Sequence, residues 1–158
     1  MKPTYKEVQF FVDQSLAAGH PIKVKLVTEI RQDNRKQHVA IEANGQYYIK
    51  DDATFLRFTE RQEAGDVNTI VKISSHGVLI LRSGAVKMRQ VFIKGKQAIG
   101  SYESPYGSFE LLTDTNNIEF KPSKQSHRKG NLFLAYLLQM QGDKVGRYTM
   151  TITYEEAK

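Results

Sequence analysis

The chain has 158 residues and contains no cysteine and no tryptophan. Without cysteine it has no disulfide scaffold, no thiolate zinc site, no iron–sulfur cluster and no cysteine nucleophile. Long apolar runs are also missing, since the longest, Leu132–Leu138, is far shorter than the roughly 20 residues of a membrane-spanning helix. Lys6, Glu7 and Asp13 interrupt the N-terminal region, where a signal peptide would be apolar. We therefore expect a cytoplasmic protein that does not associate with membranes.

Motifs of common catalytic and cofactor sites are absent as well. The sequence has no P-loop, no Gly-x-Gly-x-x-Gly turn for a dinucleotide and no Gly-x-Ser-x-Gly nucleophile elbow. Its four histidines are scattered and form no His-x-x-x-His pair: they are His20, His38, His76 and His127. The sequence therefore predicts no catalytic residue, no bound metal and no cofactor.

The composition is that of an ordinary globular domain. Hydrophobic residues make up 40% of the chain and charged residues 25%, as is usual for folded proteins. The length suits one domain, and no linker or change in composition divides it. We expect residues 1–158 to form a single domain.

An amphipathic helix is predicted at residues 4–18. Thr4 can cap it, and Glu7 stands three residues later, as in a capping box. Apolar residues then recur at spacings of three and four: they are Tyr5, Val8, Val12 and Leu16. Gly19 and Pro21 end the pattern.

After Pro21 the apolar residues recur at every second position, which is the period of a β-strand. Short strands with turns about every ten residues are expected at 22–31, 37–43, 46–50, 54–59, 67–74, 78–82, 86–93, 97–103, 108–113, 116–121, 132–141 and 147–155. Asn44-Gly45 predicts a hairpin turn between two of these strands. No helix separates the strands, so neighbours must be antiparallel. Such a chain forms either a sandwich or an up-and-down barrel.

The segment Leu132–Leu138 is apolar on both faces of its predicted strand. One face must meet the core, and the other face needs a cover. The helix at 4–18 or a partner subunit can supply that cover. We therefore expect a monomer or a homodimer.

The hairpin Arg82–Met88 carries two cations. If Ser83-Gly84 is a two-residue turn, Arg82 and Lys87 lie on the same face of the hairpin, on a diagonal. They can then bind one common anion, such as a carboxylate or phosphate. The alternative is that both are solvated surface charges.

The positive charge is concentrated in one stretch of the sequence. Lysine and arginine number 23 against 17 acidic residues, which gives a net charge of +6. No acidic residue occurs between Asp66 and Glu103, although six cations do: they are Lys72, Arg82, Lys87, Arg89, Lys94 and Lys96. This basic stretch, 67–102, predicts either a surface for nucleic acid or charge that serves solubility alone.

Three segments carry a resemblance to a known family: 69–74 (TIVKIS), 81–88 (LRSGAVKM) and 150–155 (MTITYE). Together they resemble the YwiB-like family of uncharacterised bacterial proteins, over about residues 22–156. The resemblance implies a calycin-like, or lipocalin-like, all-β barrel of about 8–10 antiparallel strands. The helix at 4–18 is an addition to it. The resemblance implies no activity.

The leading functional hypothesis is non-enzymatic binding of a small anionic or partly apolar ligand. Tyrosines in or beside strands can line such a barrel, so the candidate ligand-binding residues are Arg82, Lys87, Tyr102, Tyr106, Glu110 and Tyr136. A nucleic-acid-associated module using residues 67–102 is one alternative. A hydrolase or isomerase with a pocket around Glu110, Arg82 and Lys87 is another, and it requires these groups to converge.

Overall fold

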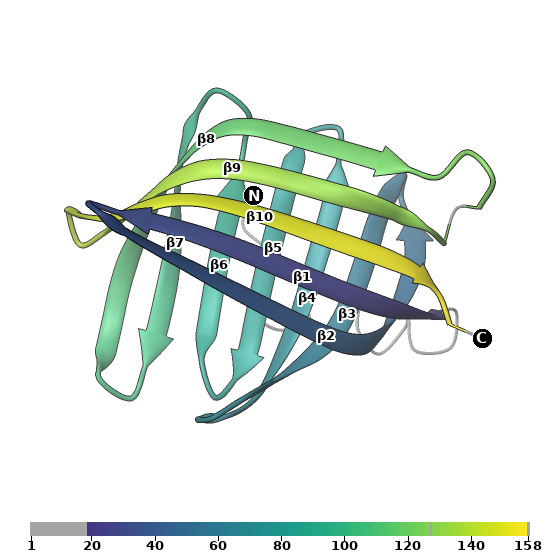
Figure 1. Cartoon of the computed structure of the whole chain (residues 1–158), viewed down its shortest axis with the longest axis horizontal. Coiled ribbons are helices and arrows are strands. Elements are labelled where there is room, and N and C mark those ends of the chain that lie inside the picture. Colours follow the sequence, from purple (N-terminus) through teal and green to yellow (C-terminus); the bar gives the residue numbers. More distant parts are fainter. Residues whose placement is uncertain (1–18, 127, 158) are drawn as a thin grey trace.

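A computed structural model describes residues 19–126 and 128–157. The described residues form ten antiparallel strands that close into one barrel (Figure 1). The strands are β1 (His20–Gln32), β2 (Arg35–Lys50), β3 (Ala53–Gln62), β4 (Gly65–Ser74), β5 (Gly77–Gly84), β6 (Lys87–Phe92), β7 (Gln97–Ser104), β8 (Gly107–Pro122), β9 (Gly130–Met140) and β10 (Asp143–Glu156). The predicted helix at 4–18 lies outside the described residues.

Each strand pairs with the next one along the chain, and the last strand pairs with the first. Most connections are tight turns, as at Asp33, Asp51 and Asp52, whose φ values of 54°, 51° and 64° are left-handed. Aspartate tolerates this conformation better than most residues. The pairing of β1 with β10, from Ile22 opposite Glu156 to Arg31 opposite Arg147, closes the wall. This closure decides for an up-and-down barrel over a sandwich.

The inner wall takes the apolar residue of each alternating pair. In β9 the inner residues Leu132, Leu134, Tyr136 and Leu138 are buried, whereas the residues between them are half-buried on the outside. One apolar face of this strand therefore meets the core, and the other lies half-buried on the outer wall. Aromatic rings fill the centre, where Tyr136 stacks on Tyr148 at 5.1 Å between ring centroids and meets Phe92 edge-on at 4.9 Å.

Two predicted breaks between strands are wrong here, because each lies inside a longer strand. Asn44-Gly45 is part of β2, which continues without interruption to Lys50. A side chain at position 45 would collide with the carbonyl oxygen of Arg57 on β3, so glycine is needed there for close approach of the two backbones. The predicted strands 108–113 and 116–121 are likewise one strand, β8, with an irregularity between Thr115 and Asn117.

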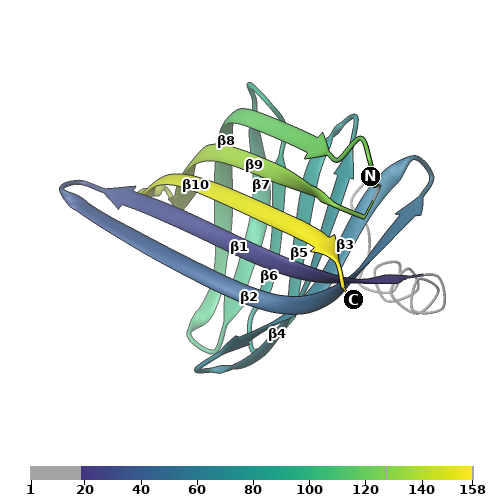
Figure 2. The same ribbon diagram turned by 45° about the vertical axis from the view of Figure 1, so that its right-hand side comes forward.

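The strands β2 and β3 stay paired over only part of their length. Their ladder runs from Lys50 opposite Ala53 to Gly45 opposite Phe58. Beyond that point β2 continues beside β1, and β3 continues beside β4. In Figure 2, β1 and β2 run together along the front of the barrel, while β3 and β4 run at a steep angle to them. The wall is therefore split at one end between β2 and β3.

Candidate functional site

The hairpin between β5 and β6 has a different register from the one expected. Arg82 pairs with Met88, and Ile80 pairs with Gln90. Strand β5 runs on through Ser83 to Gly84, because both still pair with β4, so the connection is longer than a two-residue turn. Since directly opposite residues share a face, Arg82 points into the barrel and Lys87 points out. The predicted common face of Arg82 and Lys87 is wrong.

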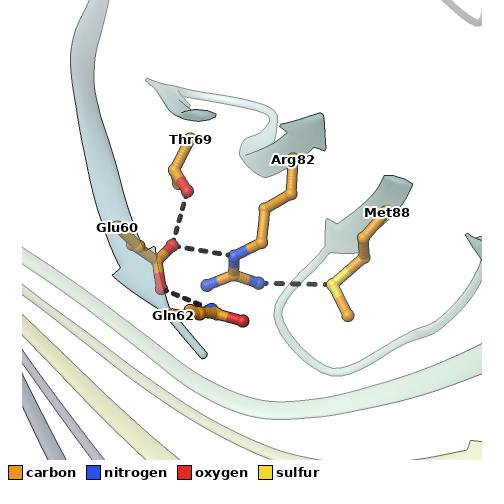
Figure 3. A network of polar contacts seen from close by, with 5 residues as sticks. All are labelled: Glu60, Gln62, Thr69, Arg82 and Met88. Atoms are coloured by element: carbon orange, nitrogen blue, oxygen red, sulfur yellow. Dashed lines mark hydrogen bonds and ion pairs between the residues drawn. The ribbon is translucent and has the colours of Figure 1, made fainter. Parts of the chain in front are cut away.

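Inside the barrel, Arg82 belongs to a polar network on the inner wall (Figure 3). Its Nε donates a hydrogen bond to Oε2 of Glu60 at 3.0 Å, and Thr69 Oγ1 donates to the same oxygen at 2.5 Å. Arg82 Nη1 lies 3.2 Å from the sulfur of Met88, and Gln62 Nε2 lies 3.5 Å from the other carboxylate oxygen. The Glu60 and Arg82 side chains are only 3% and 11% exposed. The network therefore joins four neighbouring strands through one buried ion pair.

Two other predicted site residues also lie on the inner wall. Tyr102 is half-buried and packs against Phe109, with ring centroids 6.2 Å apart. Tyr136 is buried, and burial raises the pKa of its phenol, while the nearby charge of Arg82 acts to lower it. Gln90 and Thr113 are also buried, and Gln90 Nε2 donates a hydrogen bond to Thr113 Oγ1 at 3.2 Å. The structure thus places Arg82, Tyr102 and Tyr136 together on the inner side.

The remaining predicted residues do not join them. Lys87 and Glu110 are exposed on the outer wall, and Tyr106 lies in a turn with 93% of its surface exposed. The backbone N–H of Glu110 bonds the Gln141 side chain, but its own carboxylate points to solvent. A pocket that unites Glu110, Arg82 and Lys87 is therefore absent, and the enzyme hypothesis loses its geometric basis.

A groove of about 740 Å³ lies along the strands β2 to β7. Most of its lining residues alternate with core residues along their strands, so most of the groove lies on the outer wall. Four lining residues belong to the inner face: they are Gly45, Phe58, Arg82 and Met88. The lining residues are Asn44, Gly45, Gln46, Arg57, Phe58, Thr59, Asn68, Ile70, Leu81, Arg82, Ser83, Lys87, Met88, Arg89, Ser101 and Glu103. Its volume falls in the usual range of sites for small molecules, roughly 300–1,000 Å³.

The centre of the groove is a row of directly opposite residues on four neighbouring strands. Arg57 on β3 pairs with Ile70, Ile70 with Leu81, and Leu81 with Arg89 on β6. At a strand spacing of about 4.8 Å, the two arginines stand roughly 14 Å apart across an apolar floor. Lys87 lies two residues from Arg89 on the same face, and Glu103 stands opposite Lys87. This row of the groove is thus apolar in the middle, with an arginine at each end.

Arg89 is the least satisfied of these cations. Its Nε is buried and has no hydrogen-bond partner, and burial lowers the pKa of its guanidinium. A buried donor without an acceptor is costly. Sequence reasoning did not select Arg57 or Arg89, although the spacing of two between Lys87 and Arg89 already places both on one face of a strand.

These features define a class: a small, closed, ten-stranded antiparallel β-barrel protein. The chain belongs to the family described as a domain of unknown function (DUF1934), whose model matches residues 24–152. It is 36% identical over 135 residues to the uncharacterized beta-barrel protein YwiB of Bacillus subtilis (strain 168). This match covers 85% of the chain and 93% of the relative. The crystal structure of ywiB protein from Bacillus subtilis superposes with a TM-score of 0.80 at 35% identity, covering 92% of this chain and 99% of the other. The predicted family is confirmed.

In residues 19–126 and 128–157, no group of three or more histidine or acidic side chains is placed to hold a metal ion. Within the same part of the chain, no helix is long and apolar enough to cross a membrane.

Proposed function

We propose that the protein binds a small organic anion with an apolar body, without catalysing a reaction, in the groove on its outer wall. The observation that carries this proposal is that Arg89, which lines a groove of ligand size, has a buried Nε without a hydrogen-bond partner. An anionic oxygen at this position supplies the missing acceptor and offsets the cost of the buried charge.

The rest of the groove supports the same chemistry. Ile70 and Leu81 provide an apolar floor next to Arg89, which an aromatic or aliphatic body can cover. Ser101 stands opposite Arg89 and offers a hydroxyl to the same anion. Lys87 adds positive charge, although Glu103 opposite it partly offsets that charge. A monoanion or dianion of modest size therefore suits the groove better than a densely charged ligand.

The sequence resemblance implies a calycin-like barrel, and the proposal includes this fold type. In related barrel architectures a small ligand can occupy the interior. Here the inner wall is occupied by buried rings and aliphatic side chains around Tyr136 and Phe92. Arg82, the inward cation, already has Glu60 as its partner. The outer groove is therefore the better-supported location.

The fluorescent anion 8-anilinonaphthalene-1-sulfonate, which combines a sulfonate with apolar rings, is a suitable probe. We expect Arg89→Gln to weaken its binding by about tenfold or more, because a hydrogen bond to a charged group is worth about 1.5–3 kcal/mol. The matched control is Arg147→Gln on the exposed side of β10, which should leave the affinity unchanged. Equal affinities of wild type and Arg89→Gln, at matching melting temperatures, would refute the proposal.

Single-stranded nucleic acid is a second candidate, because three of the six cations in the basic stretch lie together on the outer wall. These are Lys72, Lys87 and Arg89, and Arg57 joins them from β3. Lys72 already lies over the ring of Phe55, with Nζ 5.9 Å from its centroid. If all four cations contact phosphates, affinity for a single-stranded RNA 20-mer falls roughly 50-fold between 50 and 200 mM salt. Unchanged fluorescence anisotropy of the RNA at 50 mM salt would exclude this candidate.

A further inference from the structure

Within the described part of the chain, one side of β2 has no strand beside it over most of its length. Residues 35–44 pair with β1 on one side, whereas the ladder with β3 begins only at Gly45. Among the described residues, no other backbone hydrogen bond involves 35–44. The edge is about 30 Å long at the usual rise per residue, and Figure 2 shows this part of β2 as the free lower border of the front wall.

A long free edge exposes unpaired N–H and C=O groups that can pair with another strand. Proteins usually protect such an edge with prolines, bulges or charged side chains, and here the charged residues Arg35, Lys36 and Glu42 lie toward the two ends of the segment. The edge of β2 contains no proline, and the centre of the segment, Val39-Ala40-Ile41, is apolar. Val39 points toward the inside of the barrel end, yet 45% of its surface is exposed. The edge is thus suited to pairing.

The sequence of this edge is complementary to itself in one antiparallel register. A twofold axis perpendicular to the sheet keeps the inner faces of both copies on the same side, so only residues of the same parity can stand opposite each other. With Val39 on the axis, it meets Val39 of the partner subunit. In that register Lys36 stands opposite Glu42 of the partner subunit, and the symmetry repeats this ion pair.

We propose that two copies of the chain associate through their β2 edges, with Val39 at the twofold axis. The two barrel walls then form one continuous sheet across the interface. Two apolar valines meet at the centre, and two Lys36–Glu42 pairs flank them. Opposite charges directly across an antiparallel pair stabilise it, and like charges destabilise it. The proposal does not rest on the ligand proposal, because it concerns the strand edge and not the groove.

Cysteine cross-linking tests this register directly, because the chain has no cysteine of its own. Directly opposite residues of an antiparallel pair have Cα atoms about 4.5–5.5 Å apart, which a disulfide can span. We expect Val39→Cys to form a disulfide-linked dimer under mild oxidation at low micromolar concentration. The matched control is Ile99→Cys, which is similarly exposed, at 53%, on β7 and should stay monomeric. Equal cross-linking of both variants would overturn the proposal.

Charge reversal supplies an independent test, because it measures dimerisation at equilibrium without a covalent cross-link. By analytical ultracentrifugation, we expect the wild type to dimerise and Lys36→Glu or Glu42→Lys alone to weaken the dimer about fivefold or more. The double variant Lys36→Glu/Glu42→Lys should dimerise more tightly than either single variant, since the opposite charges are again paired across the interface. It should not fully reach the wild type, because the new charges face Glu29 and Lys25 of their own chain. Glu119→Lys, an exposed reversal on β8, is the control and should have no effect. A wild type that stays monomeric at 200 µM, or a double variant no better than the singles, refutes the proposal, and a monomer would direct attention to a foreign strand as the occupant.

Discussion

The buried pair of Arg82 and Glu60 gives the most direct test of the barrel's internal architecture. Replacing Arg82 with methionine keeps an unbranched side chain of similar length but removes the charge. Glu60, whose side chain is 3% exposed, is then left as a buried carboxylate without its cation. Removing one partner of a buried pair usually costs about 3–5 kcal/mol. For a chain of this size that corresponds to a fall in melting temperature of roughly 10–15 °C.

Further substitutions separate the cost of the unpaired charge from the cost of lost packing. In the double variant Glu60→Leu/Arg82→Met no buried charge remains, but the hydroxyl of Thr69, which is 0% exposed, loses its acceptor. That loss costs about 1–3 kcal/mol. Adding Thr69→Val removes the hydroxyl as well. We therefore expect stability to be lowest in the single variant, intermediate in the double variant and highest of the three in the triple variant.

Urea unfolding followed by far-ultraviolet circular dichroism measures these differences. Circular dichroism is the suitable signal because the chain has no tryptophan whose fluorescence could be followed. If the slope of the unfolding free energy against urea concentration is the same for all variants, the shifts in midpoint are changes of stability. If Arg82→Met unfolds within about 1 kcal/mol of the wild type, the pair behaves as a surface contact. If the triple variant is no more stable than Arg82→Met, the unpaired Glu60 charge is not the cause. Either result would refute the reasoning.

Three further predictions concern the core and the wall. Gly45→Ala should destabilise the barrel by about 1–3 kcal/mol in urea unfolding, because its Cβ meets the backbone of β3, and an unchanged midpoint would contradict the close approach. Leu134→Ala should cost about 2–5 kcal/mol, whereas Leu137→Ala, half-buried on the outside of the same strand, should cost clearly less, and equal losses would contradict the assignment of faces. Burial raises the pKa of Tyr136 and Tyr154, so the unfolded state loses these protons first, near pH 10, and stability should fall as pH rises above about 10. Absorbance at 295 nm combined with urea midpoints measures this, and a constant midpoint from pH 9 to 11 would count against it.

The strand content and the antiparallel order were predictable from the sequence, because alternation and short turns need only local information. Asp33 and Asp51 mark true turns. Asn44-Gly45 has the same local signature as a turn, yet glycine is required there by the close backbone of β3, which is far away in the sequence. Local turn chemistry cannot distinguish these two reasons for a glycine. The predicted division of β2 into strands at 37–43 and 46–50 followed from this one misinterpretation.

The candidate site shows the same limit. The sequence singled out Arg82 and Lys87, and both line the groove, but a turn longer than assumed puts them on opposite faces. The partner of Arg82, Glu60, lies 22 residues earlier in the chain, and no local pattern links them. Arg57 also lines the groove, although it lies outside the basic stretch 67–102, because pairing of β3 with β4 brings it there. Residues brought together across strands are determined by register, and register depends on turn lengths that single-sequence reasoning assigns only loosely.

The pairing of the first strand with the last has a consequence for how the chain acquires its structure. Nine of the ten ladders connect strands that follow each other in the sequence, but the ladder that joins Ile22 to Glu156 links opposite ends of the described chain. On the ribosome β1 can pair with β2 early, whereas its second neighbour emerges last. Until β10 has been synthesised, the growing sheet is open along β1, and ring closure must wait for a contact of very long sequence separation, which is characteristic of slow folding. Completion of the barrel is thus a late event that depends on an intact β10.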